Sequence, residues 1–245
     1  MRAVVVGASA GLGRALATEL ARRRCDLFLV ASDARDLRSL ASDLSLVQGV
    51  RAEWHACTVG ADGAWAQEVH AAIGAGGPVD YLLFPLGVSR DDDRGALDPA
   101  AANELLGANF TGIAHLTGLL LPGMMARGSG TIAGFGSIAA ARGRGQNVVY
   151  SAAKSALRTY FESLRHLAWR HAVHVQFFVI GYLDTQQSYG KRLPLPAASP
   201  ERIARAVADS LQRGGSGVRH LPRFWALIEW AVRIVPFSVF RNVKA

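Results

Sequence analysis

The sequence predicts an α/β protein: a single domain with a doubly wound parallel sheet, helices on both faces, and an apolar helix at the C-terminal end. Short apolar runs alternate with segments of helical spacing, the pattern of repeated βαβ units. The 245 residues are 50% hydrophobic and 19% charged, enough to build a sizeable core. Glycine contributes 26 residues, above the average of about 7%, which suits many tight turns between strands and helices.

Six apolar runs are expected to form strands, with helices between them in right-handed βαβ units. The expected strands cover residues 2–6, 27–31, 51–57, 81–86, 130–136 and 173–180. The expected helices cover residues 14–23, 37–46, 65–73, 100–121, 150–170 and 200–213. Residues 181–199 form a long connection with little periodicity, which is typical of a lid over a site. Substrate choice is expected to depend on this connection and on residues 89–98.

The formal charge of +8 and the pI of about 10.2 raise the question of an anionic partner. The basic residues are scattered, however, and the densest clusters are residues 22–24 and the pair Arg142 and Arg144. No aromatic-rich basic stripe accompanies them, so a solvated basic face is favoured over nucleic-acid binding.

Two cysteines, Cys25 and Cys57, form no C-x-x-C pair, so neither a disulfide framework nor a metal site is expected. No signal peptide is visible at the start of the sequence. No uninterrupted apolar stretch approaches the roughly 18 residues of a membrane span. A cytoplasmic location is therefore expected.

A glycine-rich turn follows the first expected strand and opens the first helix. Its spacing is G-x-x-x-G-x-G, and glycines there let the backbone approach a pyrophosphate at the positive end of the helix. A merely tight turn is the alternative, but the position between a strand and a helix favours dinucleotide binding. The expected cofactor contacts in this turn are Gly7, Ser9, Ala10, Gly11, Leu12 and Gly13.

A tyrosine and a lysine lie four residues apart on one expected helix, so their side chains share a face. The ammonium of Lys154 is expected to lower the pKa of Tyr150 from its usual value of about 10, which makes the phenol a usable acid and base. Ser137 follows the fifth strand, at the sheet edge where ligands of parallel sheets bind. Taken alone, such a Tyr–Lys pair is usually a surface pair.

Together these motifs resemble the classical short-chain dehydrogenase/reductase (SDR) family over nearly the whole chain. That family has an asparagine on the middle helix, a serine and a Y-x-x-x-K motif, and this chain has Asn109, Ser137, Tyr150 and Lys154 in the same order. Residues 181–185 resemble the family's P-G-x-x-x-T stretch, which meets the nicotinamide. The resemblance implies a Rossmann fold over residues 1–245, an NAD(P)(H)-dependent oxidoreductase acting on a carbonyl or alcohol substrate, and a homodimer or homotetramer.

The resemblance also implies a role for each residue. Tyr150 would give or take the alcohol proton, and Ser137 would hydrogen-bond the substrate carbonyl. Lys154 would hold the nicotinamide ribose, and Asn109 would anchor a water that relays protons to Lys154. Further expected cofactor contacts are Tyr150 and Lys154 themselves, Gly181, Leu183 and Thr185.

The chain departs from the family pattern on the adenine side. Cys57 stands where the family has an aspartate, and residues 84–87 replace its N-N-A-G stretch. Pro85 can donate no backbone hydrogen bond there, and Ile180 replaces the proline of P-G. Cys57 and Gly87 are still expected to contact the cofactor, although Cys57 is favoured as a small buried apolar residue.

Cofactor preference depends on the residues after the second strand. Ala31 stands where NAD-dependent members have an acid, which argues against strict NAD dependence. Ser32 could bond a 2′-phosphate, whereas Asp33 would repel one, and the second common basic position is Ala10. NADP(H) is therefore weakly preferred over NAD(H).

The C-terminal part, residues 222–241, is expected as an apolar helical extension, with Arg241 and Lys244 at its basic end. It could be a core or subunit-contact helix, a peripheral membrane contact, or a wall for an apolar substrate. The resemblance favours an apolar or lipid-linked substrate. The rival function is a non-catalytic NAD(P)-binding regulator, against which the intact set of expected catalytic residues argues.

Overall fold

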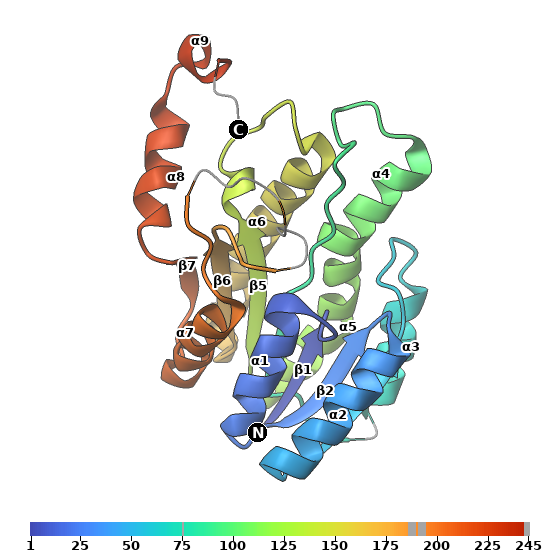
Figure 1. Ribbon diagram of the computed structural model, residues 1–245. Helices are drawn as coiled ribbons and strands as arrows, with labels where there is room; N and C mark the ends of the chain where they lie inside the picture. The colour runs from blue at the N-terminus through green and yellow to red at the C-terminus, as the bar shows by residue number, and fades with distance from the viewer. Residues whose placement is uncertain (75, 186–189, 191–194, 243–245) are drawn as a thin grey trace.

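The computed structural model describes residues 1–74, 76–185, 190 and 195–242. Its centre is one parallel sheet with the strand order β3-β2-β1-β4-β5-β6-β7 (Figure 1). The predicted doubly wound α/β fold is confirmed. The strands are β1 Arg2–Val6, β2 Asp26–Ala31, β3 Ala52–Ala56, β4 Tyr81–Phe84, β5 Thr131–Ser137, β6 His174–Ile180 and β7 Gly217–Leu221.

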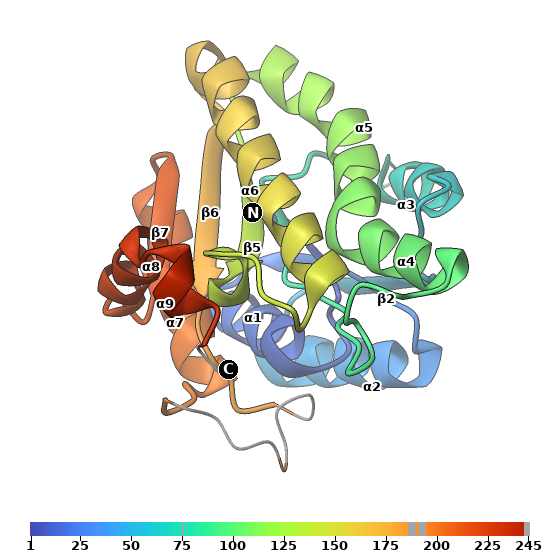
Figure 2. The same cartoon turned by 90° about the horizontal axis from the view of Figure 1, so that it is seen from above.

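Helices cover both faces of the sheet. One face carries α1 Gly11–Arg22, α2 Ala34–Gln48 and α7 Pro200–Arg213. The other carries α3 Ala64–Gly74, α4 Pro99–Leu106, α5 Gly112–Arg127 and α6 Val148–Ala168. The last two helices, α8 Trp225–Ile234 and α9 Phe237–Phe240, lie at the β7 edge (Figure 2). Single turns of 3-10 helix occur at Ile138–Ala140 and Trp169–His171.

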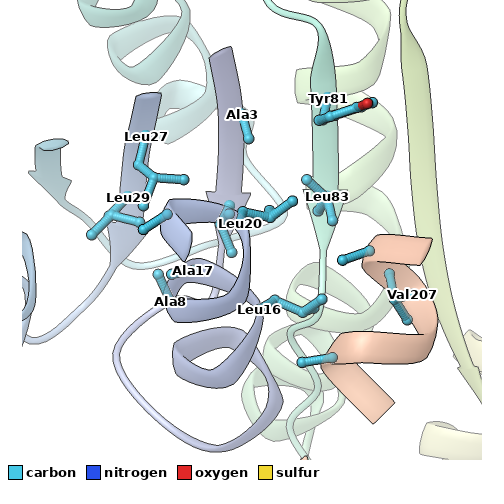
Figure 3. Packing of buried hydrophobic residues seen from close by; sticks show 14 of the residues in the cluster. Ala3, Ala8, Leu16, Ala17, Leu20, Leu27, Leu29, Tyr81, Leu83 and Val207 are labelled. Atoms are coloured by element: carbon cyan, nitrogen blue, oxygen red, sulfur yellow. The ribbon is translucent and has the colours of Figure 1, made fainter. Parts of the chain in front are cut away.

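Two apolar cores hold these layers together, because alternate residues of a buried strand face opposite helix layers. Val5 of β1 packs with the α1 and α7 side, and its neighbour Val4 packs with the α3, α5 and α6 side. In the first core, Leu16 of α1 packs in one cluster with the sheet residue Leu83 and with Val207 of α7 (Figure 3).

The expected helix over residues 100–121 is interrupted by one π-helical turn, Gly107–Thr111. A Cβ at Gly107 would lie 2.8 Å from the backbone nitrogen of Ala61, and one at Gly112 would lie 2.5 Å from Val59. The two glycines therefore let the chain after β3 pack directly against this turn. Such turns are frequent at functional sites, and this one carries Asn109.

Pro99–Arg127, which includes α4, the π turn and α5, is long and apolar enough to cross a membrane by length and composition. No stretch of this kind was expected from the sequence. Half of its most apolar window is buried in the fold, and Leu105, Ile113 and Leu116 are fully buried. The stretch is therefore a core element of the α/β domain.

The main differences from expectation lie near the C-terminus. β7 was not expected, because its sequence Gly-Val-Arg-His-Leu lacks both an apolar run and strict alternation. It pairs with β6 along one side only, and edge strands tolerate such polar residues. The expected helical extension over residues 222–241 forms two helices, because α8 begins at Trp225 and Pro236 separates it from α9.

Candidate active site

The expected site residues meet at the carboxyl edge of the sheet, where the chain leaves β1, β4, β5 and β6 (Figure 1). The turn between β1 and α1 occupies the middle of this edge. Ser137 ends β5, and Gly181 follows β6. Parallel sheets bind ligands at this position.

The glycine-rich turn is shaped by two close approaches of neighbouring atoms to its glycines. Gly7 has φ +96°, and a Cβ there would lie 2.7 Å from Cβ of Leu86. A Cβ at Gly13 would overlap the carbonyl oxygen of Gly7, so α1 begins directly against β1. No side chain caps α1 at Ala10, so the first backbone N–H groups of the helix point outward. This cradle fits the pyrophosphate of a dinucleotide.

The segment after β6 lies beside this turn. A Cβ at Gly11 would be 3.4 Å from Cγ2 of Thr185, so the two positions are in contact. Leu183 pairs with Ala198 in a parallel bridge, which closes the base of the predicted lid. Within that lid, residues 186–189 and 191–194 lie outside the described residues.

Tyr150 lies in the first turn of α6, and its phenol lies beside the Ser137 side chain, close enough for that hydroxyl to affect the pKa of the phenol. Burial raises the pKa of Tyr150, and the Ser137 hydroxyl beside it lowers the pKa in part, so that the net shift is upward. The expected downward shift is therefore wrong for this structure. Because desolvation penalises the phenolate, the proton stays on the phenol oxygen.

Lys154 is buried beneath this pair. Its Nζ donates hydrogen bonds to the carbonyl oxygens of Leu86 and Phe135, each at 3.1 Å, and lies 6.0 Å from the centroid of the Tyr150 ring. Burial lowers the pKa of Lys154 to about 7. A lysine that is only partly charged near neutral pH stabilises a phenolate less than the sequence analysis assumed.

Asn109 is fully buried in the π-helical turn. Its Nδ2 donates to the carbonyl oxygens of Val88 at 2.7 Å and Leu105 at 2.9 Å, while its Oδ1 accepts the backbone N–H of Val88 at 3.3 Å. The amide thereby fixes the loop after β4. A Cβ at Gly87 would lie 3.4 Å from Lys154 Nζ and 3.5 Å from Asn109 Oδ1, so this glycine borders both side chains. The water-anchoring role of Asn109 stays a prediction.

Sequence reasoning missed Asp93, which is 1% exposed in the loop between β4 and α4. Its Oδ1 accepts the backbone N–H of Val149 at 3.0 Å, and its Oδ2 accepts that of Tyr150 at 2.9 Å. Asn147, the residue before α6, has φ +60° and provides no side-chain cap. Asp93 therefore caps α6 from a distant loop. The run of three aspartates at 91–93 is the sequence signal that could have suggested a cap.

The expected cofactor-selecting residues have distinct surroundings. Ser32 is exposed, whereas the carboxylate of Asp33 caps α2 by accepting the backbone N–H of Asp36 at 2.9 Å. Arg14, which the sequence analysis did not consider, donates from Nε to the Ser9 carbonyl oxygen at 2.9 Å and lies 3.6 Å from the Asp36 carboxylate. A guanidinium therefore lies between the glycine-rich turn and the start of α2.

Cys57 follows β3, and its backbone N–H donates to the carbonyl oxygen of Ala31 at 2.9 Å. Burial raises the pKa of its thiol to about 11, so the thiol is protonated near neutral pH. It packs against the second apolar core, which agrees with the favoured small apolar role. Across the described ranges, no three His, Cys, Asp or Glu side chains gather into a metal site.

Comparison with known proteins agrees with this geometry. The sequence profile described as short chain dehydrogenase matches residues 1–193. An uncharacterized oxidoreductase of Myxococcus xanthus is 30% identical over 88% of this chain and 83% of its own length. The very-long-chain 3-oxoacyl-CoA reductase of Anas platyrhynchos is 26% identical over 98% of this chain and 78% of its own length.

A solved short-chain dehydrogenase from Sphingobium yanoikuyae, in complex with NADPH, has the same fold. The two structures superpose with a TM-score of 0.83 over 99% of this chain and 96% of that chain, at 21% identity. The fold, the glycine-rich turn and the profile match lead to one assignment. The chain belongs to the short-chain dehydrogenase family of NAD(P)-dependent oxidoreductases.

Proposed function

We propose that the protein is an NADP(H)-dependent reductase that converts a ketone on a long apolar chain to the secondary alcohol, with Tyr150 as the general acid. The observation that carries this proposal is that Ser137 and Tyr150 lie side by side, with the buried Lys154 6.0 Å from the centroid of the Tyr150 ring, near the glycine-rich turn. The bound nicotinamide supplies the hydride. The family's own substrates are carbonyl and alcohol compounds.

Side chains of the protein orient the substrate and supply the proton. The Ser137 hydroxyl hydrogen-bonds the substrate carbonyl oxygen, and the Tyr150 hydroxyl donates its proton to that oxygen as the alcohol forms. The raised pKa of Tyr150 keeps the phenol protonated near neutral pH, which favours the reducing direction. Lys154, with a pKa of about 7, can return a proton toward this pair after turnover.

Two features support NADP(H). The Asp33 carboxylate is engaged in capping α2, which lessens its role as a partner for ribose hydroxyls. Arg14 places a cation between the turn and α2, where a 2′-phosphate would gain a charge-assisted hydrogen bond. The solved Sphingobium relative is in complex with NADPH.

The apolar substrate class rests on the C-terminal helices and on one relative. Trp225 of α8 packs against Gly181, where a Cβ would overlap the indole, so α8 borders the segment beside the glycine-rich turn. The Anas platyrhynchos relative is named for very-long-chain 3-oxoacyl-CoA. A 3-oxoacyl thioester has both the ketone and the apolar chain that this site would take. Assembly into a homodimer or homotetramer stays a prediction.

The test is consumption of NADPH with 3-oxoacyl thioesters of increasing chain length. We expect kcat/KM to rise with chain length and to be higher with NADPH than with NADH. Equal rates for short and long chains would refute the apolar substrate. Tight NADPH binding without turnover on any carbonyl of a broad panel would favour the rival function, a cofactor-binding regulator.

A further inference from the structure

The outer face of α8 and α9 exposes a row of large apolar side chains. Leu227 is 72% exposed, Trp230 is 64% exposed, Ile234 is 60% exposed and Phe237 is 70% exposed. The first three recur at helical spacing, so they form one stripe along α8. Both views place these helices at the β7 edge of the molecule, with α9 beyond the end of α8 (Figures 1 and 2). Contiguous exposed apolar surface of this kind marks an interaction site.

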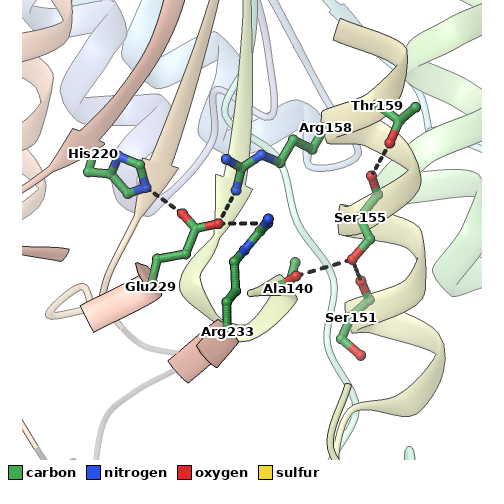
Figure 4. Close-up of polar contacts among 8 residues, drawn as sticks. All are labelled: Ala140, Ser151, Ser155, Arg158, Thr159, His220, Glu229 and Arg233. Atoms are coloured by element: carbon green, nitrogen blue, oxygen red, sulfur yellow. Dashed lines mark hydrogen bonds and ion pairs between the residues drawn. The ribbon is translucent and has the colours of Figure 1, made fainter. Parts of the chain in front are cut away.

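The inner face of α8 is firmly anchored, so the helix cannot rotate to bury this stripe. Glu229 is 4% exposed, and its carboxylate pairs with Arg158 of α6, His220 of β7 and Arg233 of α8 (Figure 4). Trp225, on the same side of the helix, is 3% exposed. The apolar stripe is therefore a fixed outward surface.

The surroundings of the stripe are strongly basic. Residues 138–148 and 222–242 contain five arginines and a single acid, Glu229, which is already paired. The two segments are in contact, because Arg142 donates to the carbonyl oxygen of Val232 at 3.2 Å and lies 4.2 Å from the centroid of the Phe240 ring. Arg233 pairs with Glu229, and the other four arginines leave an excess of positive charge beside the apolar stripe.

A cavity of about 440 Å³ opens between α9 and the first turns of α6. Its lining combines apolar and cationic groups, among them Val148, Phe237, Phe240, Arg144 and Arg241. Within the described residues, neither of these two arginines has an ion-pair partner. Guanidinium groups beside aromatic rings suit an anionic head group that carries an apolar tail.

We propose that α8 and α9 dock the protein on an anionic phospholipid surface. The stripe of Leu227, Trp230, Ile234 and Phe237 would enter the head-group layer, and Arg144 and Arg241 would hold lipid phosphates at the cavity. The positive charge of this surface favours an anionic bilayer over a second copy of the chain as its partner. A second copy placed on this face would bring two such arginine sets together, whereas an anionic bilayer neutralises them.

The test uses sedimentation of the full-length protein with vesicles of phosphatidylcholine alone and of equal parts phosphatidylcholine and phosphatidylglycerol. We expect binding to the mixed vesicles and weaker binding at about 1 M salt, where the Debye length falls to about 3 Å. Trp230→Glu should lower the partition coefficient at least about tenfold, the factor expected from losing the burial of one large apolar side chain.

Trp169→Glu is the matched control, because Trp169 is 63% exposed, close to the 64% of Trp230, and lies after α6. It should bind vesicles as the unchanged protein does. The proposal is overturned if the unchanged protein fails to bind the mixed vesicles, or if both variants lose binding equally. It is also overturned if Trp230→Glu turns a dimer into a monomer in solution without changing vesicle binding. Vesicle binding needs no turnover, so this result and that of the reductase assay are independent.

Discussion

The side chain of Asp93 accepts the backbone N–H of Tyr150 at 2.9 Å, although the two residues are 57 positions apart. A loop of the expected substrate region therefore holds the first turn of the helix that presents the tyrosine. The same carboxylate accepts the N–H of Val149 at 3.0 Å, and the backbone carbonyl oxygen of Asp93 accepts the N–H of Asn147 at 2.7 Å. Asp93 is thus a positioning residue for Tyr150.

Asp93→Ala should lower kcat at least about tenfold, because loss of a cap costs about 1 kcal/mol and also frees the turn that carries Tyr150. Asp98→Ala is the matched control. Asp98 caps α4 from the same region, accepting the N–H groups of Ala100 and Ala101 at 2.9 Å. Thermal unfolding should show similar losses of stability for both variants, whereas steady-state kinetics should show the large kcat loss for Asp93→Ala alone. Equal kcat values for the two variants would contradict the positioning role.

Tyr150→Phe should reduce turnover by roughly 10²–10⁴-fold, the usual contribution of general acid–base catalysis. NADPH affinity, measured by fluorescence titration, should stay near that of the unchanged protein. Tyr160→Phe serves as the control, because Tyr160 lies on the same helix and its hydroxyl donates to the Ala114 carbonyl oxygen at 3.5 Å, outside the candidate site. Full activity in Tyr150→Phe would exclude this tyrosine as the proton donor.

Lys154 should make the cofactor-free protein more stable as pH rises above 7. Burial lowers the pKa of Lys154 to about 7 from its ordinary value of 10.5. Between these values the unfolded chain binds more protons than the folded protein, so the free energy of unfolding rises with pH, by up to about 1.4 kcal/mol per pH unit. Urea unfolding at pH 7, 8 and 9 should show this rise for the unchanged protein and not for Lys154→Met. If the free energy of unfolding changed with pH in the same way for both proteins, the lysine would not be desolvated.

Arg14→Ala should weaken NADPH binding about tenfold and leave NADH binding unchanged, because a charge-assisted hydrogen bond to the 2′-phosphate is lost. Arg22→Ala, which removes an exposed arginine at the other end of α1, is the control. Asp33→Arg should raise the NADPH:NADH affinity ratio, at a cost of about 1 kcal/mol in stability from the lost α2 cap. An unchanged NADPH:NADH affinity ratio in the Arg14 and Asp33 variants would show that neither side chain lies near the ribose that carries the 2′-phosphate.

Glu229→Gln should weaken the ion pairs that attach α8 to α6 and β7. Burial alone would raise the pKa of Glu229, but the His220 hydrogen bond and the Arg158 and Arg233 charges lower it overall. The pairing therefore stabilises the fold above the carboxyl's unfolded pKa of about 4.3 and is lost as pH falls through the lower folded value. At neutral pH, Glu229→Gln should cost about 1–3 kcal/mol and speed proteolysis near the C-terminus. Glu162→Gln, at an exposed site on α6, should change neither.

The sequence was sufficient for most of the fold, because period-2 and period-3.6 apolar patterns decide which segments form strands and helices. β1 was predicted with its observed bounds, Arg2–Val6, since a fully buried parallel strand is a continuous aliphatic run. β7 was not predicted, because Arg219 and His220 interrupt its apolar character. The π-helical turn was not predicted, because it depends on contact between Gly107 and the distant loop at Ala61.

In the candidate site, too, local motifs were predicted from the sequence, whereas features that depend on distant contacts were not. Ser137, Tyr150 and Lys154 carry a local motif, so the sequence was enough to propose them, and the structure brings them together. The direction of the Tyr150 pKa shift could not be predicted, because it depends on how much water the folded site excludes. Asp93 could not be assigned either, since its partners lie 56 and 57 positions away.

The contact between Trp225 and Gly181 gives the protein an intrinsic optical reporter. The indole is buried against the backbone that leads to Thr185, and its N–H has no hydrogen-bond partner among the described side chains and backbone groups. Indole emission responds to small changes in local polarity, so movement of residues 181–185 would change the fluorescence of this tryptophan. A variant that keeps Trp225 as its only tryptophan would follow nucleotide binding and vesicle docking in real time without any added dye.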